Sequence, residues 1–197
     1  DIKKLYNYLK DKDLLLIEEV IKQHDYLNKL YNKSINRVTV ITLLYNDITY
    51  IISMNLNLGN NSIVDSLKRG GMTNKIDIET GTSLHPFCDR GLNNYYFHPI
   101  TKEKINNIKL PYINEIKLLV KDLSNIIKSV RYVSWDIAIT NDGPILLGAS
   151  PLPNIYQFFI HNEDNKGILP LINEILNKES SVDSIEIKKD DKLSISN

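Results

Sequence analysis

Residues 133–154 read VSWDIAITNDGPILLGASPLPN and contain the clearest structural signal in the chain. Two apolar runs flank Asn141-Asp142-Gly143, residues that favour a tight turn, so the stretch predicts a β-hairpin over 132–149. One carboxylate, Asp136, lies inside the first apolar run. A carboxylate at the edge of a core costs free energy unless it is paired, hydrogen-bonded or bound to a metal. Two interpretations stay open: an outward side chain that caps a loop or pairs with a lysine, or a ligand of Mg²⁺.

A second hairpin and two helices are predicted elsewhere. β-Branched runs on both sides of Asn46-Asp47 predict a hairpin over 37–56. Apolar residues at helical spacing predict a helix over about 112–129, and an apolar stretch with Pro170 in its first turn predicts a last helix near 168–177. Because hairpins dominate and βαβ units are lacking, the predicted fold class is α+β, with an antiparallel sheet flanked by helices.

The chain divides by composition into three segments. Residues 1–13 are charged and form an N-terminal segment of uncertain structure, residues 14–177 form the folded domain, and residues 178–197 form a charged tail whose composition is typical of disorder. Within the domain, residues 14–31 predict a short strand that runs into an amphipathic helix. Residues 59–107 are rich in Gly, Asn, Lys and Thr and predict long loops with short strands, which often carry function.

Composition excludes several function classes. Lys plus Arg and Asp plus Glu are 24 each among 197 residues, so the formal charge is zero and broad nucleic-acid binding is not expected. The single cysteine excludes an intramolecular disulfide and a cysteine-based zinc site, and favours a reducing, cytoplasmic location. No apolar run reaches about 18 residues, so no membrane span is expected. The four histidines are too widely spaced for a short metal-ligand pair: His24, His85, His98 and His161.

Three stretches, in this order, carry a resemblance to a known family. They are LLIEEVIKQHDYLNKLYNKSINRVTVITLL (15–44), IVDSLKRGGMTNKIDIETG (63–81) and the hairpin stretch 133–154. Together they resemble the ATP-grasp domain associated with sugar transfer, which is related to α-L-glutamate ligases. The resemblance covers roughly residues 14–176, which makes 14–177 an ATP-grasp-like domain.

The resemblance implies a fold and an activity. ATP-grasp proteins hold ATP between two α+β lobes, phosphorylate a carboxylate and pass the acyl group to an amine or another nucleophile. ATP and Mg²⁺ are therefore the implied cofactors, and a carboxylate or sugar-linked molecule from cell-surface polysaccharide biosynthesis is the implied substrate. The resemblance also implies that an N-terminal lobe is missing from this chain or is replaced by a partner protein.

The resemblance also implies site residues. The letters IEEVI would form the hinge strand that holds adenosine, so Glu18, Glu19 and Val20 are candidate nucleotide-binding residues. Lys75 lies in a stretch that resembles a loop beside the nucleotide and is a candidate for phosphate binding, with a solvated loop lysine as the alternative. Asp136 matches the first metal-binding acid of the family, which makes it a candidate for both the metal and the nucleotide.

Departures from the family pattern leave the activity open. The strand after Asp-Gly-Pro ends in the family with Glu, a small residue and Asn, and the Glu and Asn bind Mg²⁺; here these positions are Gly148, Ala149 and Ser150. Thr39 stands where the family has an arginine. Arg37 is expected to be a poor substitute unless the register of the strand adjusts, because two strand residues span about 6–7 Å. Two hypotheses follow: an ATP-dependent carboxylate–amine ligase, or a non-catalytic binding module that has lost its metal site. No catalytic residue is assigned.

Overall fold

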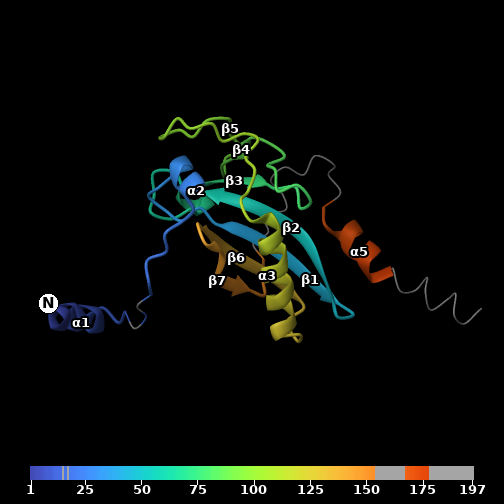
Figure 1. Ribbon diagram of the computed structural model, residues 1–197, viewed down its shortest axis with the longest axis horizontal. Coiled ribbons are helices and arrows are strands. Elements are labelled where there is room, and N and C mark those ends of the chain that lie inside the picture. Colours follow the sequence, from blue (N-terminus) through green and yellow to red (C-terminus); the bar gives the residue numbers. More distant parts are fainter. Residues whose placement is uncertain (15, 17, 154–166, 178–197) are drawn as a thin grey trace, which may run out of the picture.

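A seven-stranded antiparallel sheet forms the centre of the protein, in the order β5-β4-β3-β2-β1-β6-β7 (Figure 1). The computed structural model describes residues 1–14, 16, 18–153 and 167–177. The strands are β1 (Val38–Tyr45), β2 (Ile48–Leu58), β3 (Met72–Lys75), β4 (Phe87–Cys88), β5 (Asn94–Tyr95), β6 (Tyr132–Thr140) and β7 (Gly143–Ser150). The helices are α1 (Ile2–Asp11), α2 (Asp25–Leu30), the 3-10 turn η1 (Leu67–Arg69), α3 (Ile113–Ile126) and α5 (Leu169–Asn177). The predicted α+β fold is confirmed.

Both predicted hairpins are present. Asn46 and Asp47 connect β1 and β2, with φ angles of 49° and 58°. Two successive left-handed residues suit the right-handed twist of the flanking strands, which explains why asparagine and aspartate stand here. Gly143, with a φ of 126°, begins β7 after the second turn. The predicted helices correspond to α3 and α5 within a few residues at their ends.

The hinge strand predicted from the letters IEEVI does not form. The described residues between Glu18 and His24 have no regular secondary structure. The backbone N–H of His24 donates to Ile139 O at 2.7 Å, but no ladder extends this contact. A strand needs a neighbour that satisfies its backbone groups along its length, and the described part of the chain provides none here. The uncertain N-terminal segment contains α1, capped by the Asp1 side chain, and α1 buries no residue. The predicted tail, 178–197, lies outside the described residues.

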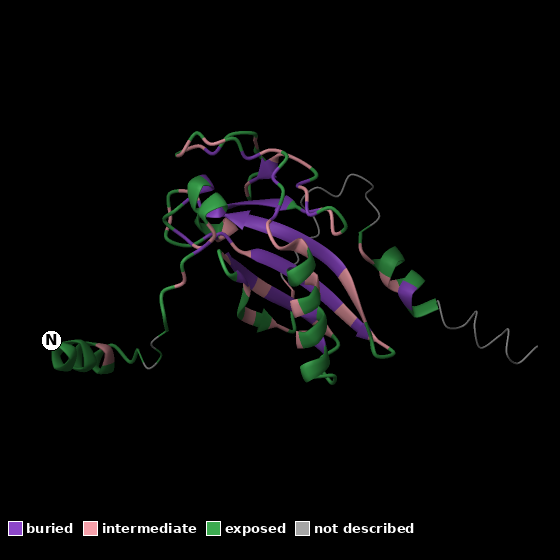
Figure 2. Ribbon diagram, viewed as in Figure 1, coloured by how far each residue is buried: buried purple, intermediate pink, exposed green. Residues whose placement is uncertain are grey.

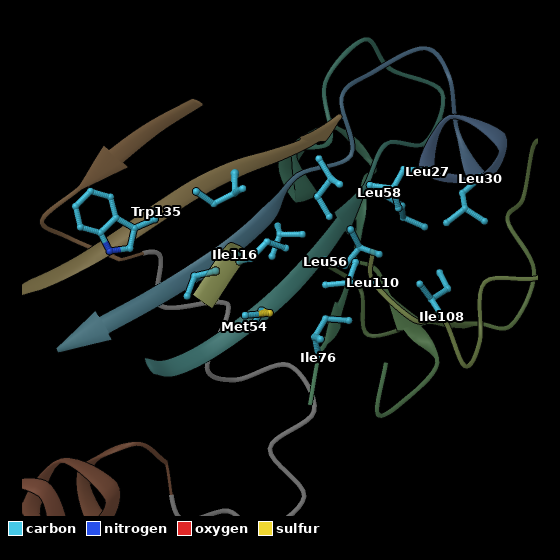
Figure 3. Close-up of a cluster of buried hydrophobic side chains, with 14 of the residues drawn as sticks. Leu27, Leu30, Met54, Leu56, Leu58, Ile76, Ile108, Leu110, Ile116 and Trp135 are labelled. Carbon is cyan, nitrogen blue, oxygen red and sulfur yellow. The ribbon is translucent and has the colours of Figure 1, made fainter. Parts of the chain in front are cut away.

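One face of the sheet carries the main hydrophobic core. Helix α3 crosses this face, and the strand residues beneath it are buried (Figure 2). In Figure 3, Trp135 lies at one end of the core and Leu27 and Leu30 of α2 at the other. The core residues labelled there are Leu27, Leu30, Met54, Leu56, Leu58, Ile76, Ile108, Leu110, Ile116 and Trp135. The alternation of apolar and polar residues in β1, β2 and β6 places polar side chains on the opposite face.

The opposite face is divided into an apolar part and a polar part. Ile175 of α5 packs on Ile41 and Ile52, which covers the apolar part. The polar part lies near the start of β1 and contains the candidate site. None of the helices in the described residues has the length and apolar character needed to cross a bilayer.

Two substitutions on α3 test the main core. Ile116 is 0% exposed and Leu118 is 60% exposed. Ile116→Ala removes buried methyl groups and leaves a cavity, so we expect a loss of about 2–5 kcal/mol of unfolding free energy in urea titrations. Leu118→Ala should change it by less than about 0.5 kcal/mol. Equal losses in the two variants would contradict the packing of α3 on the sheet.

Candidate functional site

Five residues from five neighbouring strands form a row across the polar face, which we call the polar row. Lys75 lies opposite Asn55, Asn55 opposite Thr39, Thr39 opposite Asp136, and Asp136 opposite Gly148. Residues directly opposite one another on antiparallel strands project from the same face of a sheet. The two sequence candidates Lys75 and Asp136 therefore share a face, about 14 Å apart across three strand spacings.

Asp136 is held by two side chains from the start of β1. Arg37 Nη1 lies 2.5 Å from Asp136 Oδ2, and Thr39 Oγ1 donates to Asp136 Oδ1 at 2.8 Å. Thr39 Oγ1 in turn accepts from Asn57 Nδ2 at 2.9 Å. Arg37 thus reaches Asp136 from a position two residues before Thr39, which lies directly opposite Asp136. Both oxygens of Asp136 are used inside the protein.

Arg37 also binds a second carboxylate. Its Nε lies 3.1 Å from Asp65 Oδ2, and its backbone N–H donates to the same oxygen at 3.2 Å. Asp65 is 8% exposed. Burial raises the pKa of the Asp65 carboxyl from 3.8 to about 6, and the attraction of the Arg37 guanidinium opposes this increase. We call the arrangement Asp65–Arg37–Asp136 the Arg37 bridge.

Two glycines shape the loop that supplies Asp65. Gly70 has a φ of 86° and ends η1, a backbone conformation that favours glycine. A Cβ on Gly71 would lie 2.6 Å from the backbone oxygen of Asp65, so a larger residue could not close the loop. The Gly-Gly pair thereby sets the position of the Asp65 carboxylate, a role that its spacing in the sequence does not reveal.

The residues of the polar row do not fit a magnesium ion. Magnesium needs free carboxylate oxygens, but those of Asp136 are bonded to Arg37 and Thr39. Gly148 offers no ligand atom, and the Ser150 hydroxyl is engaged by the backbone of Leu152 at 3.2 and 3.3 Å. No group of three His, Cys, Asp or Glu side chains in the described residues could hold a metal ion.

Glu19 and Val20, from the predicted hinge strand, line cavities and are not part of a strand. Glu19 and Val20 border a cavity of about 640 Å³ and a second of about 320 Å³. Thr140 also lines the smaller cavity, and it lies four residues beyond Asp136 on the same face of β6, about 13 Å away. Glu18 is exposed and lines neither of these two cavities. The hinge segment, residues 18–24, thus borders a cavity with Thr140, which projects from the same face of β6 as Asp136.

Sequence analysis did not propose Asn55, Asn57 or Asp65 as site residues. The letters SMNLNL, residues 53–58, alternate polar and apolar side chains with the period of a strand. That alternation assigns Asn55 and Asn57 to one face of the strand, so the sequence pattern alone is enough to identify both as polar-face residues. The contact between Asp65 and Arg37 joins residues 28 positions apart and has no local signal.

A seven-stranded antiparallel sheet with a few helices is consistent with an α+β ATP-grasp-like fold. The profile of the sugar-transfer associated ATP-grasp family matches residues 2–176. The chain belongs to this family. Comparisons with curated proteins and with solved structures gave no match. Membership supports nucleotide binding and a link to sugar transfer.

The raised pKa of Asp65 predicts how stability changes with pH. Because the native pKa of about 6 exceeds 3.8, the folded protein binds the extra proton, and this stabilisation is lost as pH rises through about 6. The unfolding free energy of the wild type relative to Asp65→Asn should therefore rise by on the order of 2–3 kcal/mol between about pH 7 and about pH 4.

Urea titrations at several pH values measure this difference. Asp47→Asn is the control, because its hydrogen bond to Lys128 lowers the pKa of Asp47 and reverses the direction of the change. A wild type that loses stability relative to Asp65→Asn on acidification would show that Asp65 is ionised throughout.

Proposed function

We propose that this protein is a non-catalytic member of its family, a module that binds a nucleotide or related ligand without carboxylate–amine ligation. The Arg37 bridge is the observation that supports this proposal. It places a fixed positive charge 2.5 Å from the carboxylate that the family uses for its metal. A divalent cation at Asp136 would have to displace that charge.

The electrostatics of phosphoryl transfer explain why this matters. Acyl phosphate formation depends on cations that stabilise charge on the transferred group. Loss of one preorganised contact costs about 3–4 kcal/mol of transition-state stabilisation. Here the second metal carboxylate is replaced by Gly148 and the amide ligand by Ser150. Several such losses together are incompatible with ordinary ligase turnover.

The alternative is an active ATP-dependent carboxylate–amine ligase. It is favoured by one arrangement: Lys75 and Asp136 share a face, and Glu19 lines a cavity with Thr140 of the same strand as Asp136. In that case the Arg37 bridge must open when the nucleotide binds, and Asp136 must become available to Mg²⁺. The metal content of the complex separates the two functions.

For either function we place the protein in cell-surface polysaccharide biosynthesis and in the cytoplasm. The family links it to sugar transfer. A nucleotide ligand and the buried free thiol of Cys88 both suit a reducing compartment that contains ATP. The carboxylate or sugar-linked partner of the ligase alternative would be found in the same compartment.

Calorimetry of the full-length protein with ATP tests the proposal directly. We expect the affinity in EDTA and in excess Mg²⁺ to differ by less than about threefold, because Arg37 already balances Asp136. No phosphate should be released over hours with a panel of carboxylates and amines. Binding that requires Mg²⁺, with ATP consumption abolished by Asp136→Asn, would establish the ligase instead.

Restoring the family residues should create a metal site. A Cβ on Gly148 would meet no atom within 4 Å, so Gly148→Glu has room for its side chain. We expect the variant Arg37→Thr/Gly148→Glu/Ser150→Asn to bind Mn²⁺ at least about tenfold more tightly than the wild type in electron paramagnetic resonance titrations, since removal of the guanidinium frees Asp136 and two free carboxylates suit a hard cation. The same variant with Gln at position 148 is the neutral control. Equal Mn²⁺ affinity of wild type and variant would contradict a lost site.

A further inference from the structure

Strand β7 forms an open edge of the sheet. It pairs with β6 on one side, and no described strand pairs with its other side (Figure 1). The backbone N–H and C=O groups along such an edge are free to pair with another strand. The opposite edge, β5, has two residues, whereas β7 has eight. β7 is therefore the edge that offers the longer ladder to a partner strand.

The side chains of β7 leave this edge only partly protected. Native proteins usually place charged residues on an open edge, and the sequence of β7, GPILLGAS, contains none. Its three central apolar residues, Ile145, Leu146 and Leu147, are 37%, 41% and 39% exposed. Pro144 removes one backbone donor next to the turn, so the ladder that remains runs over residues 145–150. An uncharged apolar edge of this kind favours pairing with another strand.

An apolar cavity of about 200 Å³ lies beside the edge, on the face that carries α3. It is lined by the end of α3, the start of β6 and the end of β7. Trp135 and Ala149, which lie opposite each other on β6 and β7, belong to this lining together with Ile127 and Val130. Ile127 and Val130 are 59% and 37% exposed. The cavity thus has room for an aliphatic side chain that approaches from beyond β7.

A second copy of β7 supplies such a side chain when the two edges pair in antiparallel orientation. Leu146 lies opposite Ile137 on β6. Ala149 lies opposite Trp135, and both of these β6 residues belong to the main core. Leu146 and Ala149 therefore project from the same face of the sheet. A twofold axis at the middle of residues 145–150 brings Leu146 of each copy opposite Ala149 of the other, beside its cavity.

The two ends of the edge carry opposite charges. Asp142 directly precedes β7 at one end, and Arg131 directly precedes β6 at the other end. Both side chains are exposed, and neither forms an ion pair with another described residue. In the antiparallel pair, Asp142 of one copy lies level with Arg131 of the other across two strand spacings, or about 10 Å. An extended arginine side chain covers most of this distance, so opposite charges flank the apolar centre of the contact on both sides.

We propose that β7 pairs with β7 of a second copy of this chain, so that the two sheets join into one continuous antiparallel sheet. Leu146 of each copy then fills the apolar cavity of the other. The contact uses neither the Arg37 bridge nor a ligand, and the inference is therefore independent of the proposed function. A ladder over residues 145–150 is smaller than a standard interface of about 1,600 Å², so we expect a reversible dimer with a dissociation constant of about 10–100 µM.

Sedimentation equilibrium of the full-length protein without ligand, over about 1–500 µM, tests the dimer. The mass of the wild type should rise from one chain toward two across this range. Leu146→Lys should weaken the association at least about tenfold, because a charged residue on an edge strand opposes pairing. Leu118→Lys is the matched control, since Leu118 of α3 is 60% exposed and lies outside the cavity lining. A wild type that stays monomeric throughout, or equal association of Leu146→Lys and the wild type, overturns the proposal.

A charge exchange tests the antiparallel arrangement without a substitution inside the strand. Asp142→Arg and Arg131→Asp each bring like charges together in their own dimers, so each variant alone should associate about threefold to tenfold more weakly than the wild type. An equal mixture of the two variants restores opposite charges across the contact and should recover most of the wild-type affinity. A mixture that associates no more tightly than either variant alone overturns the arrangement.

Discussion

The Arg37 bridge determines the chemistry of the polar face. It joins the start of β1 to a loop residue 28 positions away and to a strand residue 99 positions away. A partly buried carboxylate is stable only when partners replace its lost hydration, and one guanidinium serves two carboxylates here. Since Thr39 and Asn57 complete the hydrogen bonding around Asp136, the bridge leaves no coordination site for a cation.

A second polar network explains how the hinge segment is held without a strand. Gln23 Nε2 donates to Tyr31 O at 2.9 Å and to Ser34 O at 3.0 Å. Asn36, 0% exposed, donates to Gln23 Oε1 at 3.0 Å and accepts from Gly59 N–H. Buried polar networks whose hydrogen bonds are satisfied rigidify the segments that they join. The hinge segment is therefore positioned by side chains on its C-terminal side, and Glu19 and Val20 remain free to line cavities.

The regular elements were predictable because their signals are local. The turn residues Asn46-Asp47 and the helical spacing of Ile116 and Val120 each act within a few positions, so both hairpins, α3 and α5 could be read from the sequence. The site was predictable only in part. Lys75 and Asp136 were proposed separately, but the shared row depends on strand order and register, which join distant segments. The Arg37 bridge was not predicted because its three residues are distant in the sequence and no local pattern pairs them.

The main core and the polar row lie on different faces of the sheet, so side chains of the polar row can change without disturbing the packing of the main core. The main core lies on the α3 face, and it contains none of the residues in the Arg37 bridge or the polar row. Substitutions on the polar face therefore leave the burial of apolar surface, the largest stabilising contribution to folding, unchanged. Charged side chains on the other face, such as Arg37, can therefore be exchanged without loss of the buried apolar contacts that hold α3 on the sheet.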